Sequence, residues 1–218
     1  MIILVVAPHS DDAELGAGAS IGRWIGEGHR VVILNLSDTS NINGQEVGLR
    51  LRAEAMAASS RLGVRRVDIT FGDFPTRHFS SERQLILDFL IQIGRQLQPD
   101  VVIGPSSSDT HQDHGVVAAE IQRAFKGSTI LGLDTYWNIP KQSFPMVVEV
   151  SHENILAKVA ALAEFASQSN KRYMQSESVF SQGRIRGLPR GFDFAEAFSV
   201  FQISMSLATL IGKTDADE

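Results

Sequence analysis

The feature that most constrains the fold of this chain is the alternation of short apolar runs with longer amphipathic segments. The short runs are rich in Val, Ile and Leu, as strands buried on both faces are: Ile2–Val6, Val31–Leu36, Val67–Phe71, Val101–Gly104 and Thr129–Leu133. The longer segments carry apolar residues at helical spacing: Glu14–Glu27, Glu46–Leu62, Ser81–Leu97 and Gly115–Phe125. Such alternation predicts an α/β fold whose mostly parallel central sheet is covered by helices on both faces.

The later part of the chain follows a less regular pattern. It predicts a strand at Met146–Val150, a helix at Ser151–Gln168, an irregular Gly- and Arg-rich surface loop at Gly183–Phe194 and a last strand at Phe198–Met205. No internal repeat or linker is visible. We therefore expect residues 1–218 to form a single domain, with a frayed tail over about residues 213–218.

Composition excludes several classes of function. The formal net charge is −5 and no long basic run is present, which argues against binding to nucleic acid or to anionic lipid. The chain has no cysteine, so thiolate metal sites and cysteine nucleophiles are excluded. The N-terminal apolar run is too short to span a bilayer. We expect a cytoplasmic protein without membrane insertion, in which the apolar stretch Phe198–Ile211 forms a core strand or a homo-oligomer contact.

Two polar clusters follow predicted strands. Pro8-His9-Ser10-Asp11-Asp12-Ala13-Glu14 comes directly after the first strand, and Asp109-Thr110-His111-Gln112-Asp113-His114 follows the strand Val101–Gly104. Ligands of open parallel sheets bind at the carboxyl ends of the strands, so both clusters are expected at the binding edge. Two histidines and one carboxylate are a ligand set that holds zinc and leaves a position open for water.

Each cluster also has a structural explanation. Asp11 and Glu14 match an Asp-x-x-Glu capping box at a helix start, which would leave His9 and Asp12 unexplained. His111 and His114 could be ordinary loop histidines. The two clusters together, at one sheet edge, favour the metal site.

The two clusters also carry a family resemblance. The string from Ala7 to Gly18 resembles the first motif of the PIG-L/LmbE-like N-deacetylases, usually His-Pro-Asp-Asp-x-Glu with a Gly-rich continuation, and Asp109 to His114 resembles their His-Pro-Asp-His motif. Weaker landmarks are Glu54 with Leu62-Gly63, Ser167-Gln168 and Glu196-Ala197-Phe198. The resemblance implies a Rossmann-like three-layer α/β/α fold.

Carried over by position, the resemblance implies that His9, Asp12 and His114 bind the metal. It implies Zn²⁺, with Fe²⁺ or another divalent ion possible. Asp11 matches the general base, and His111 matches the histidine that stabilises the transition state or donates a proton. The implied enzyme is a zinc-dependent carbohydrate deacetylase. It would remove the N-acetyl group of an N-acetylglucosamine-type sugar or glycoside by hydrolysing a linear amide C–N bond with metal-activated water.

Some positions depart from the family pattern. Ser10 and Gln112 replace the usual prolines, and Leu51 stands where an arginine is usual. A common Pro-Asp-Gly after the third strand reads Pro75-Thr76-Arg77 here. Asp113 is expected to orient a histidine from outside the ligand set.

The sequence suggests some substrate-contacting residues and leaves one alternative function open. Arg77 and His78 follow a strand at the binding edge and are predicted to contact substrate. Tyr136-Trp137 could line a sugar pocket. The alternative function is a nucleotide- or sugar-binding module without hydrolysis, in which Gly16-Ala17-Gly18 would form a nucleotide loop. Tight helix packing explains these glycines better, because the motif lacks the spacing of a dinucleotide fingerprint.

Overall fold

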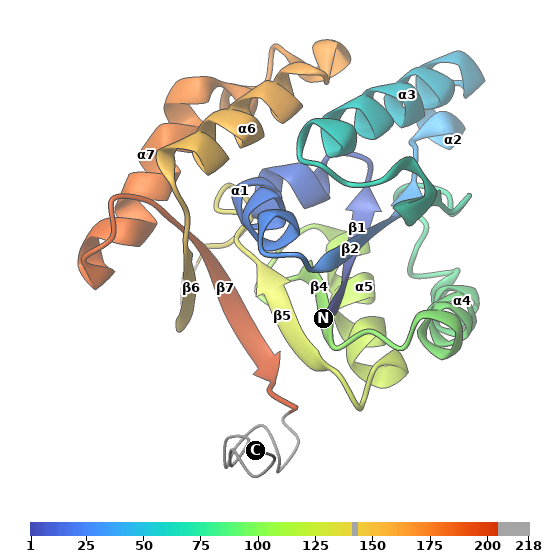
Figure 1. The fold of residues 1–218 in the computed structure, drawn as a ribbon. Helices are drawn as coiled ribbons and strands as arrows, with labels where there is room; N and C mark the ends of the chain where they lie inside the picture. Colours follow the sequence, from blue (N-terminus) through green and yellow to red (C-terminus); the bar gives the residue numbers. More distant parts are fainter. Residues whose placement is uncertain (141–143, 205–218) are drawn as a thin grey trace, which may run out of the picture.

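The computed structural model describes residues 1–140 and 144–204, and within these ranges the strands form one seven-stranded sheet (Figure 1). The strands are β1 (Ile2–His9), β2 (Arg30–Ser37), β3 (Ile69–Phe71), β4 (Val101–Pro105), β5 (Thr129–Leu133), β6 (Met146–Glu149) and β7 (Ala195–Gln202). Their order is β3-β2-β1-β4-β5-β7-β6. The first five are parallel to one another, and β7 runs antiparallel to β5 and β6. The predicted α/β fold with a mostly parallel sheet is confirmed.

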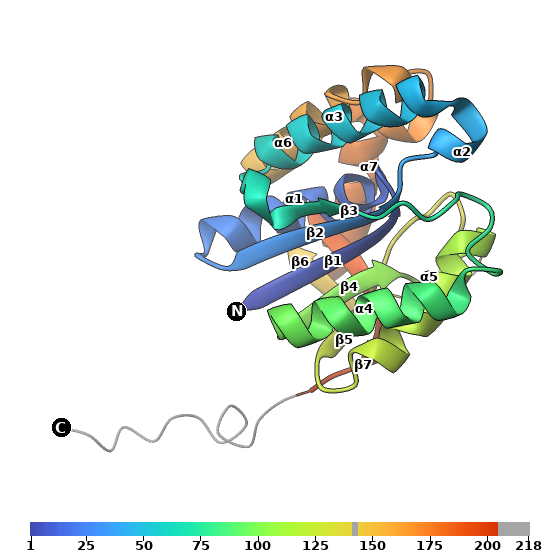
Figure 2. The same cartoon turned by 90° about the vertical axis from the view of Figure 1, so that its right-hand side faces the viewer.

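Helices cover both faces of the sheet (Figure 2). They are α1 (Asp12–Gly26), α2 (Ser40–Asn43), α3 (Gln45–Arg61), α4 (Arg83–Leu97), α5 (Gln112–Ala124), α6 (His152–Ala163) and α7 (Ser176–Gly187). On β1, Ile3, Val5 and Ala7 belong to the core under α1, α3 and α6, whereas Leu4 and Val6 belong to the core under α4 and α5. This alternation explains why β1 reads as a continuous apolar run: both of its faces are buried.

The prediction of an irregular loop at Gly183–Phe194 was wrong. Helix α7 continues to Gly187, and a 3₁₀ turn follows at Leu188–Arg190. The glycines allow close packing here: a Cβ on Gly187 would lie 2.7 Å from the carbonyl oxygen of Phe192, and one on Gly183 would lie 3.0 Å from Ile155. Composition therefore suggested flexibility where the glycines in fact let a helix approach its neighbours.

Other boundaries moved by a few residues. The helix expected over Ser151–Gln168 ends at Ala163 and is followed by a 3₁₀ turn at Ala166–Gln168. The last strand begins at Ala195 and ends at Gln202; Met205 and the tail at 213–218 lie outside the described residues. No described helix is both long enough and apolar enough to cross a bilayer. That the whole chain forms one domain stays a prediction.

Candidate metal centre

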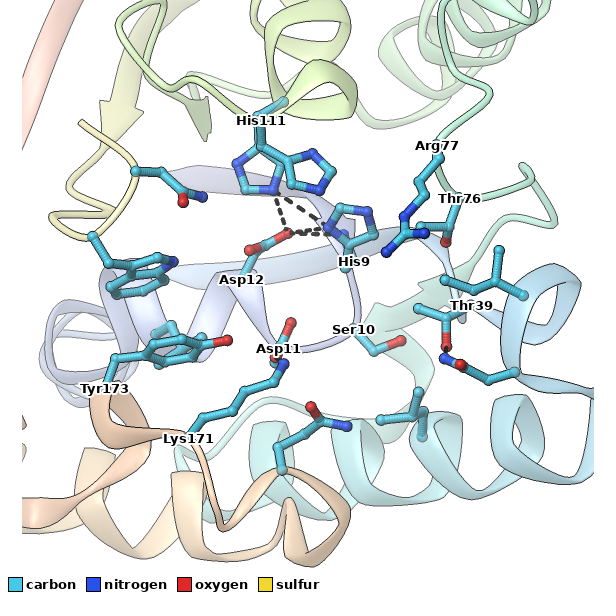
Figure 3. A pocket seen from close by; sticks show the side chains of 18 residues that line it. His9, Ser10, Asp11, Asp12, Thr39, Thr76, Arg77, His111, Lys171 and Tyr173 are labelled. Atoms are coloured by element: carbon cyan, nitrogen blue, oxygen red, sulfur yellow. Dashed lines mark hydrogen bonds and ion pairs between the residues drawn. The ribbon is translucent and has the colours of Figure 1, made fainter. Parts of the chain in front are cut away.

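The two polar clusters meet where the sheet order reverses. From β1 the chain continues to β2 on one side, whereas β4 lies on the other, so the loops after β1 and β4 diverge and leave a crevice. The loop after β1 leads into α1 through Ser10 and Asp11, and the loop after β4 leads into α5 through His111. Figure 3 shows side chains from both loops pointing into this crevice.

Three potential ligand atoms converge in the crevice: His9 Nδ1, Asp12 Oδ2 and His114 Nε2. The oxygen of Asp12 lies 3.2 Å from each nitrogen, and the two nitrogens are 3.3 Å apart. In a tetrahedral zinc site with bonds of about 2.0–2.1 Å, neighbouring ligand atoms lie about 3.3 Å apart. The triangle therefore has the dimensions of three corners of such a site.

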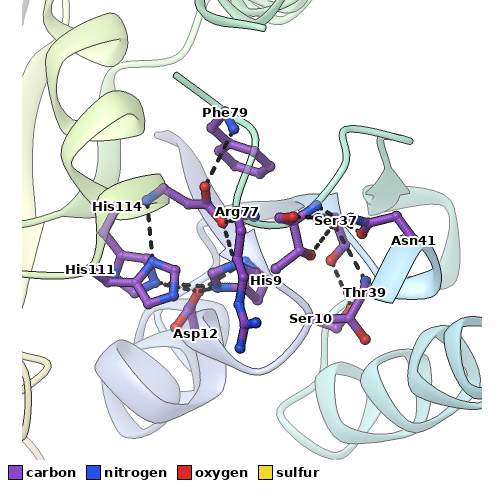
Figure 4. A network of polar contacts seen from close by, with 12 residues as sticks. His9, Ser10, Asp12, Ser37, Thr39, Asn41, Arg77, Phe79, His111 and His114 are labelled. Carbon is purple, nitrogen blue, oxygen red and sulfur yellow. Dashed lines mark hydrogen bonds and ion pairs between the residues drawn. The ribbon is translucent and has the colours of Figure 1, made fainter. Parts of the chain in front are cut away.

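The outer nitrogen of each histidine binds a carboxylate. Figure 4 shows His9, Asp12 and His114 lying next to one another. His9 Nε2 donates to Asp113 Oδ2 at 3.1 Å, and His114 Nδ1 donates to Asp109 Oδ2 at 2.8 Å. These hydrogen bonds fix the tautomers, so the inner nitrogens present lone pairs to the Asp12 oxygen. The Asp12 carboxylate and the two inner nitrogens attract positive charge, which protons on the imidazoles or a divalent cation between the three atoms can supply.

The electrostatics of the site also favour a cation. Burial alone would lower the pKa of His9, but its hydrogen bonds with Asp113 and Asp12 raise it to about 9. Burial opposes the charge on His114 as well, yet the charge of Asp12 and the hydrogen bond with Asp109 raise its pKa to about 10. The carboxylates thus stabilise positive charge strongly enough to overcome desolvation.

Asp113, which was expected to orient a histidine, makes a hydrogen bond with His9, and Asp109 makes a matching hydrogen bond with His114 that was not predicted. Asp113 also accepts hydrogen bonds from the backbone N–H of Arg77 at 2.7 Å and of Phe79 at 3.4 Å. Asp109 accepts from the Thr135 hydroxyl and from the backbone N–H of His111. The signal that could have found Asp109 is its place at the start of the second cluster, because metal-bound histidines usually have a carboxylate partner.

Asp11 lies beside the triangle without belonging to it. Its side chain caps no backbone N–H of α1, and Glu14 is buried, where it accepts a hydrogen bond from Ser59; the capping-box explanation is therefore wrong. Burial and the charge of Asp12 raise the pKa of Asp11, while Lys171 opposes the rise. The Lys171 ammonium lies 3.6 Å from Asp11 Oδ2. Lys171 was missed because nothing in its local sequence marks it.

His111 sits at the N-cap of α5, where its Nδ1 accepts the backbone N–H of Asp113 at 3.2 Å. The hydrogen of a neutral imidazole is then on Nε2, so His111 can donate to a ligand without being protonated. Its ring centroid lies 4.9 Å from that of His9 and 4.7 Å from that of His114. His111 thus stands next to the ligand triangle as a hydrogen-bond donor.

Comparison with known proteins agrees with this geometry. The sequence pattern of the family described as GlcNAc-PI de-N-acetylase (PIG-L) matches residues 4–125, more than half of the chain. The chain belongs to this family. It is 29% identical over 122 residues to the diacetylchitobiose deacetylase of Thermococcus kodakarensis; the match covers 51% of this chain and 44% of that protein, so the aligned part is less than half of the relative's length.

Solved structures share the fold. A conserved protein of Thermus thermophilus superposes with a TM-score of 0.76 at 24% identity, over 94% of this chain and 96% of that one. The 4-carboxy-2-hydroxymuconate hydratase of Pseudomonas putida superposes with a TM-score of 0.75 at 19% identity, over 95% of this chain and 99% of that one. At these identities the likeness concerns the fold alone, and the hydratase shows that the fold also carries another reaction.

The candidate metal centre opens into a cavity of about 270 Å³. Its walls come from the loop after β1 with the start of α1, from the segment around α2 and from α3, and from the segments after β3, β4, β5 and α6. Of the two predicted substrate residues, Arg77 lines this cavity and His78 does not. Arg77 has a left-handed backbone, with φ of 70°. Its side chain lines the cavity, whereas the side chain of the adjacent His78 does not.

Two other walls of the cavity are formed by Leu51 and by the pair Trp137 and Tyr173. Leu51 lines the cavity, and the arginines that flank it are engaged elsewhere: Arg50 with Glu54, and Arg52 with Asp38 and Asp73. On another wall, Trp137 stacks on Tyr173 with ring centroids 4.4 Å apart. The sequence suggested Trp137 as a residue that could line a sugar pocket, but it did not suggest Tyr173.

The family landmarks Glu54 and Ser167-Gln168, outside the two clusters, contact each other next to the cavity. Glu54 accepts hydrogen bonds from the backbone N–H and the hydroxyl of Ser167, at 3.1 and 2.5 Å, and the next residue, Gln168, lines the cavity. Gly16 packs against β5, since a Cβ there would lie 2.8 Å from Leu133. This contact explains Gly16 as a packing residue and removes the main argument for a nucleotide loop.

Asp109→Asn is expected to weaken metal binding by about 10- to 100-fold without unfolding the protein. Asn has the same shape, and it can still accept hydrogen bonds, but it removes the charge that orients His114 across 2.8 Å. Competition with a metal-binding dye measures the affinity. Asp100→Asn is a matched control, because Asp100 caps the opposite end of β1 at Ile2. Unchanged affinity in Asp109→Asn would show that Asp109 does not support the site.

Proposed function

We propose that this protein is a metal-dependent hydrolase that removes the N-acetyl group from an N-acetylglucosamine-type sugar or glycoside. The observation that carries the proposal is the triangle of His9, Asp12 and His114 with Asp11 beside it, open to one cavity. Membership in the PIG-L family and similarity to a diacetylchitobiose deacetylase support the choice of an acetamide as the bond that is cleaved. Zn²⁺ is the proposed ion, with Fe²⁺ or another divalent ion as the alternative.

The protein groups divide the chemistry among them. A divalent ion in the triangle supplies Lewis acidity, which lowers the pKa of water and polarises an amide carbonyl. Asp11 accepts the proton of the attacking water, because its carboxylate lies next to the ligands and is not one of them. His111 donates a hydrogen bond from Nε2 to the oxyanion that develops on the carbonyl oxygen. The leaving amine then takes a proton either from Asp11, which received it from the water, or from His111 in its protonated, imidazolium form.

Lys171 holds Asp11 in place for this task. Its ammonium lies 3.6 Å from the Asp11 carboxylate and 5.5 Å from the centre of the Tyr173 ring. Tyr173 is in turn stacked on Trp137, so Asp11 is supported by a chain of packed side chains. The same aromatic wall offers an apolar surface on which a sugar ring can rest.

Acetate release over a panel of N-acetylated sugars and glycosides tests the proposal. Protein reconstituted with one equivalent of zinc is expected to release acetate from at least one N-acetylglucosamine derivative, and chelation is expected to abolish the release. Reconstitution with Fe²⁺ decides between the two candidate ions. A teicoplanin deacetylase of the same fold has been solved in a zinc-inhibited form, so zinc is added here in stoichiometric amount and not in excess.

A second candidate follows from the hydratase that shares this fold. Metal binding without acetate release, together with hydration of an unsaturated carboxylate, would replace the deacetylase by a lyase. Metal binding with neither reaction, but with saturable sugar or nucleotide binding, would favour the module without hydrolysis. Each result is read from the same purified protein.

A further inference from the structure

The loop that carries Arg77 is held in place from both sides. The backbone N–H of Arg77 donates to Asp113 at 2.7 Å, and the backbone N–H of His78 donates to the carbonyl of Pro75 at 3.1 Å. Thr76 exchanges two hydrogen bonds between its backbone and the side-chain amide of Asn41, at 2.9 and 3.0 Å. A non-glycine residue with φ of 70° is held in this way only by its surroundings. The base of the Arg77 side chain is therefore fixed relative to the metal centre.

The Arg77 side chain turns from this loop into the cavity (Figure 3). In that view it reaches down beside His9, on the other side of the ligand triangle from Tyr173. Within the described part of the chain, its guanidinium has no ion-pair or hydrogen-bond partner. The other groups of the cavity are matched: Lys171 pairs with Asp11, and His9 and His114 surround Asp12. Arg77 is exposed, so its charge is accessible to a ligand that enters the cavity.

The neighbours of Arg77 on this wall of the cavity indicate which kind of ligand group could bind there. Thr39 lines the cavity, and its hydroxyl oxygen accepts the side-chain amide of Asn43 at 3.0 Å, which leaves the hydroxyl hydrogen free to donate. Ile42 and Leu51 complete the wall with apolar surface. A guanidinium fork beside a hydroxyl donor fits the oxygens of a carboxylate or a phosphate, whereas a neutral sugar would leave the charge unused.

We propose that the acylated substrate also carries an oxyanion group, a carboxylate or a phosphate, and that the Arg77 guanidinium binds it. The proposal rests on the proposed function and names the substrate class of the same site. The metal centre holds the acetamide, the Trp137–Tyr173 wall holds the ring, and Arg77 selects the anionic substituent.

The test compares a neutral substrate with charged relatives of it. The panel is the methyl glycoside of N-acetylglucosamine, its 1-phosphate and 6-phosphate, and the 3-O-lactyl derivative, which carries a carboxylate. With zinc-loaded wild type, we expect kcat/KM for at least one anionic member to exceed that of the neutral glycoside by roughly tenfold, the lower end of what a charge-assisted hydrogen bond contributes at an accessible site. The phosphate and carboxylate arms identify the group.

Arg77→Gln is expected to remove this preference through KM, so that kcat/KM falls by roughly tenfold more for the preferred anionic member than for the neutral glycoside. Arg77→Lys should keep part of the preference. Arg66→Gln is the matched control, because Arg66 is exposed, lies outside the cavity lining and loses the same charge. Equal kcat/KM for all members in wild type, or a preference that survives in Arg77→Gln, would overturn the proposal.

A binding measurement separates this proposal from the proposed function. Calorimetry with the same compounds on zinc-loaded wild type and Arg77→Gln needs no turnover, and direct contact of phosphate with the metal contributes equally to both proteins. Tighter anion binding that depends on Arg77, without acetate release, would retain the anion site and reject the deacetylase. Acetate release without Arg77-dependent binding would retain the deacetylase and reject the anion site.

Discussion

Asp11→Asn is expected to lower kcat by about 10²- to 10⁴-fold while the protein keeps its fold and its metal. The amide has the shape of the carboxylate but cannot accept a proton from water. The fold should tolerate the change because the Asp11 side chain caps no backbone group of α1. The substitution weakens the contact with Lys171, which is 3.6 Å long and partly exposed, and it also relieves the repulsion between Asp11 and Asp12.

Steady-state kinetics and elemental analysis of the same preparation measure the two expected results. Asp12→Asn is the matched control: it is the same substitution at the next residue, and it should weaken metal binding because a neutral amide is a poorer ligand. Normal turnover of metal-loaded Asp11→Asn would remove Asp11 as the base. If Asp11→Asn instead loses the metal and Asp12→Asn retains it, the two roles are exchanged.

Local pattern was enough to predict most of the sheet and its helices. The run Thr129–Leu133 was predicted with the bounds that the strand has, because a strand buried on both faces is apolar throughout. Helix α7 was missed because Gly183 and Gly187 weaken the helical signal. Gly183 is explained by its contact with Ile155, which no local window contains, and Gly187 by its close contact with the backbone of Phe192 and Phe194, where the chain folds back after the helix.

The residues of the candidate metal centre could be found from sequence because they lie in two contiguous clusters at the ends of neighbouring strands. Parallel pairing of β1 with β4 then brings the clusters together. Lys171 could not be predicted, because its pairing with Asp11 spans most of the chain and depends on how the segment after α6 folds back. Arg77 and His78 were indistinguishable in sequence, and only the folded structure shows that Arg77 lines the cavity whereas His78 does not.

His114→Ala is expected to lose most of the bound metal and, with it, the proposed activity. His114 supplies one of three converging ligand atoms, and two protein ligands hold a divalent ion poorly. The substitution also leaves the buried Asp109 carboxylate without its imidazole partner, although the Thr135 hydroxyl and the His111 backbone N–H remain. A buried group that loses a partner costs about 1–3 kcal/mol, so a modest fall in Tm is expected as well.

His111→Ala is the control that makes this result specific. It removes the same ring from the same cluster, but His111 Nδ1 is occupied by the backbone N–H of Asp113, so the metal should remain bound while kcat falls. His9, His111 and Asp113 form a second group of close ligand atoms, and metal loss in His111→Ala but not in His114→Ala would move the site there. We expect the opposite, because Asp113 already binds His9 and the backbone of Arg77 and Phe79, whereas the inner nitrogen of His114 faces, among the described residues, only His9 and Asp12.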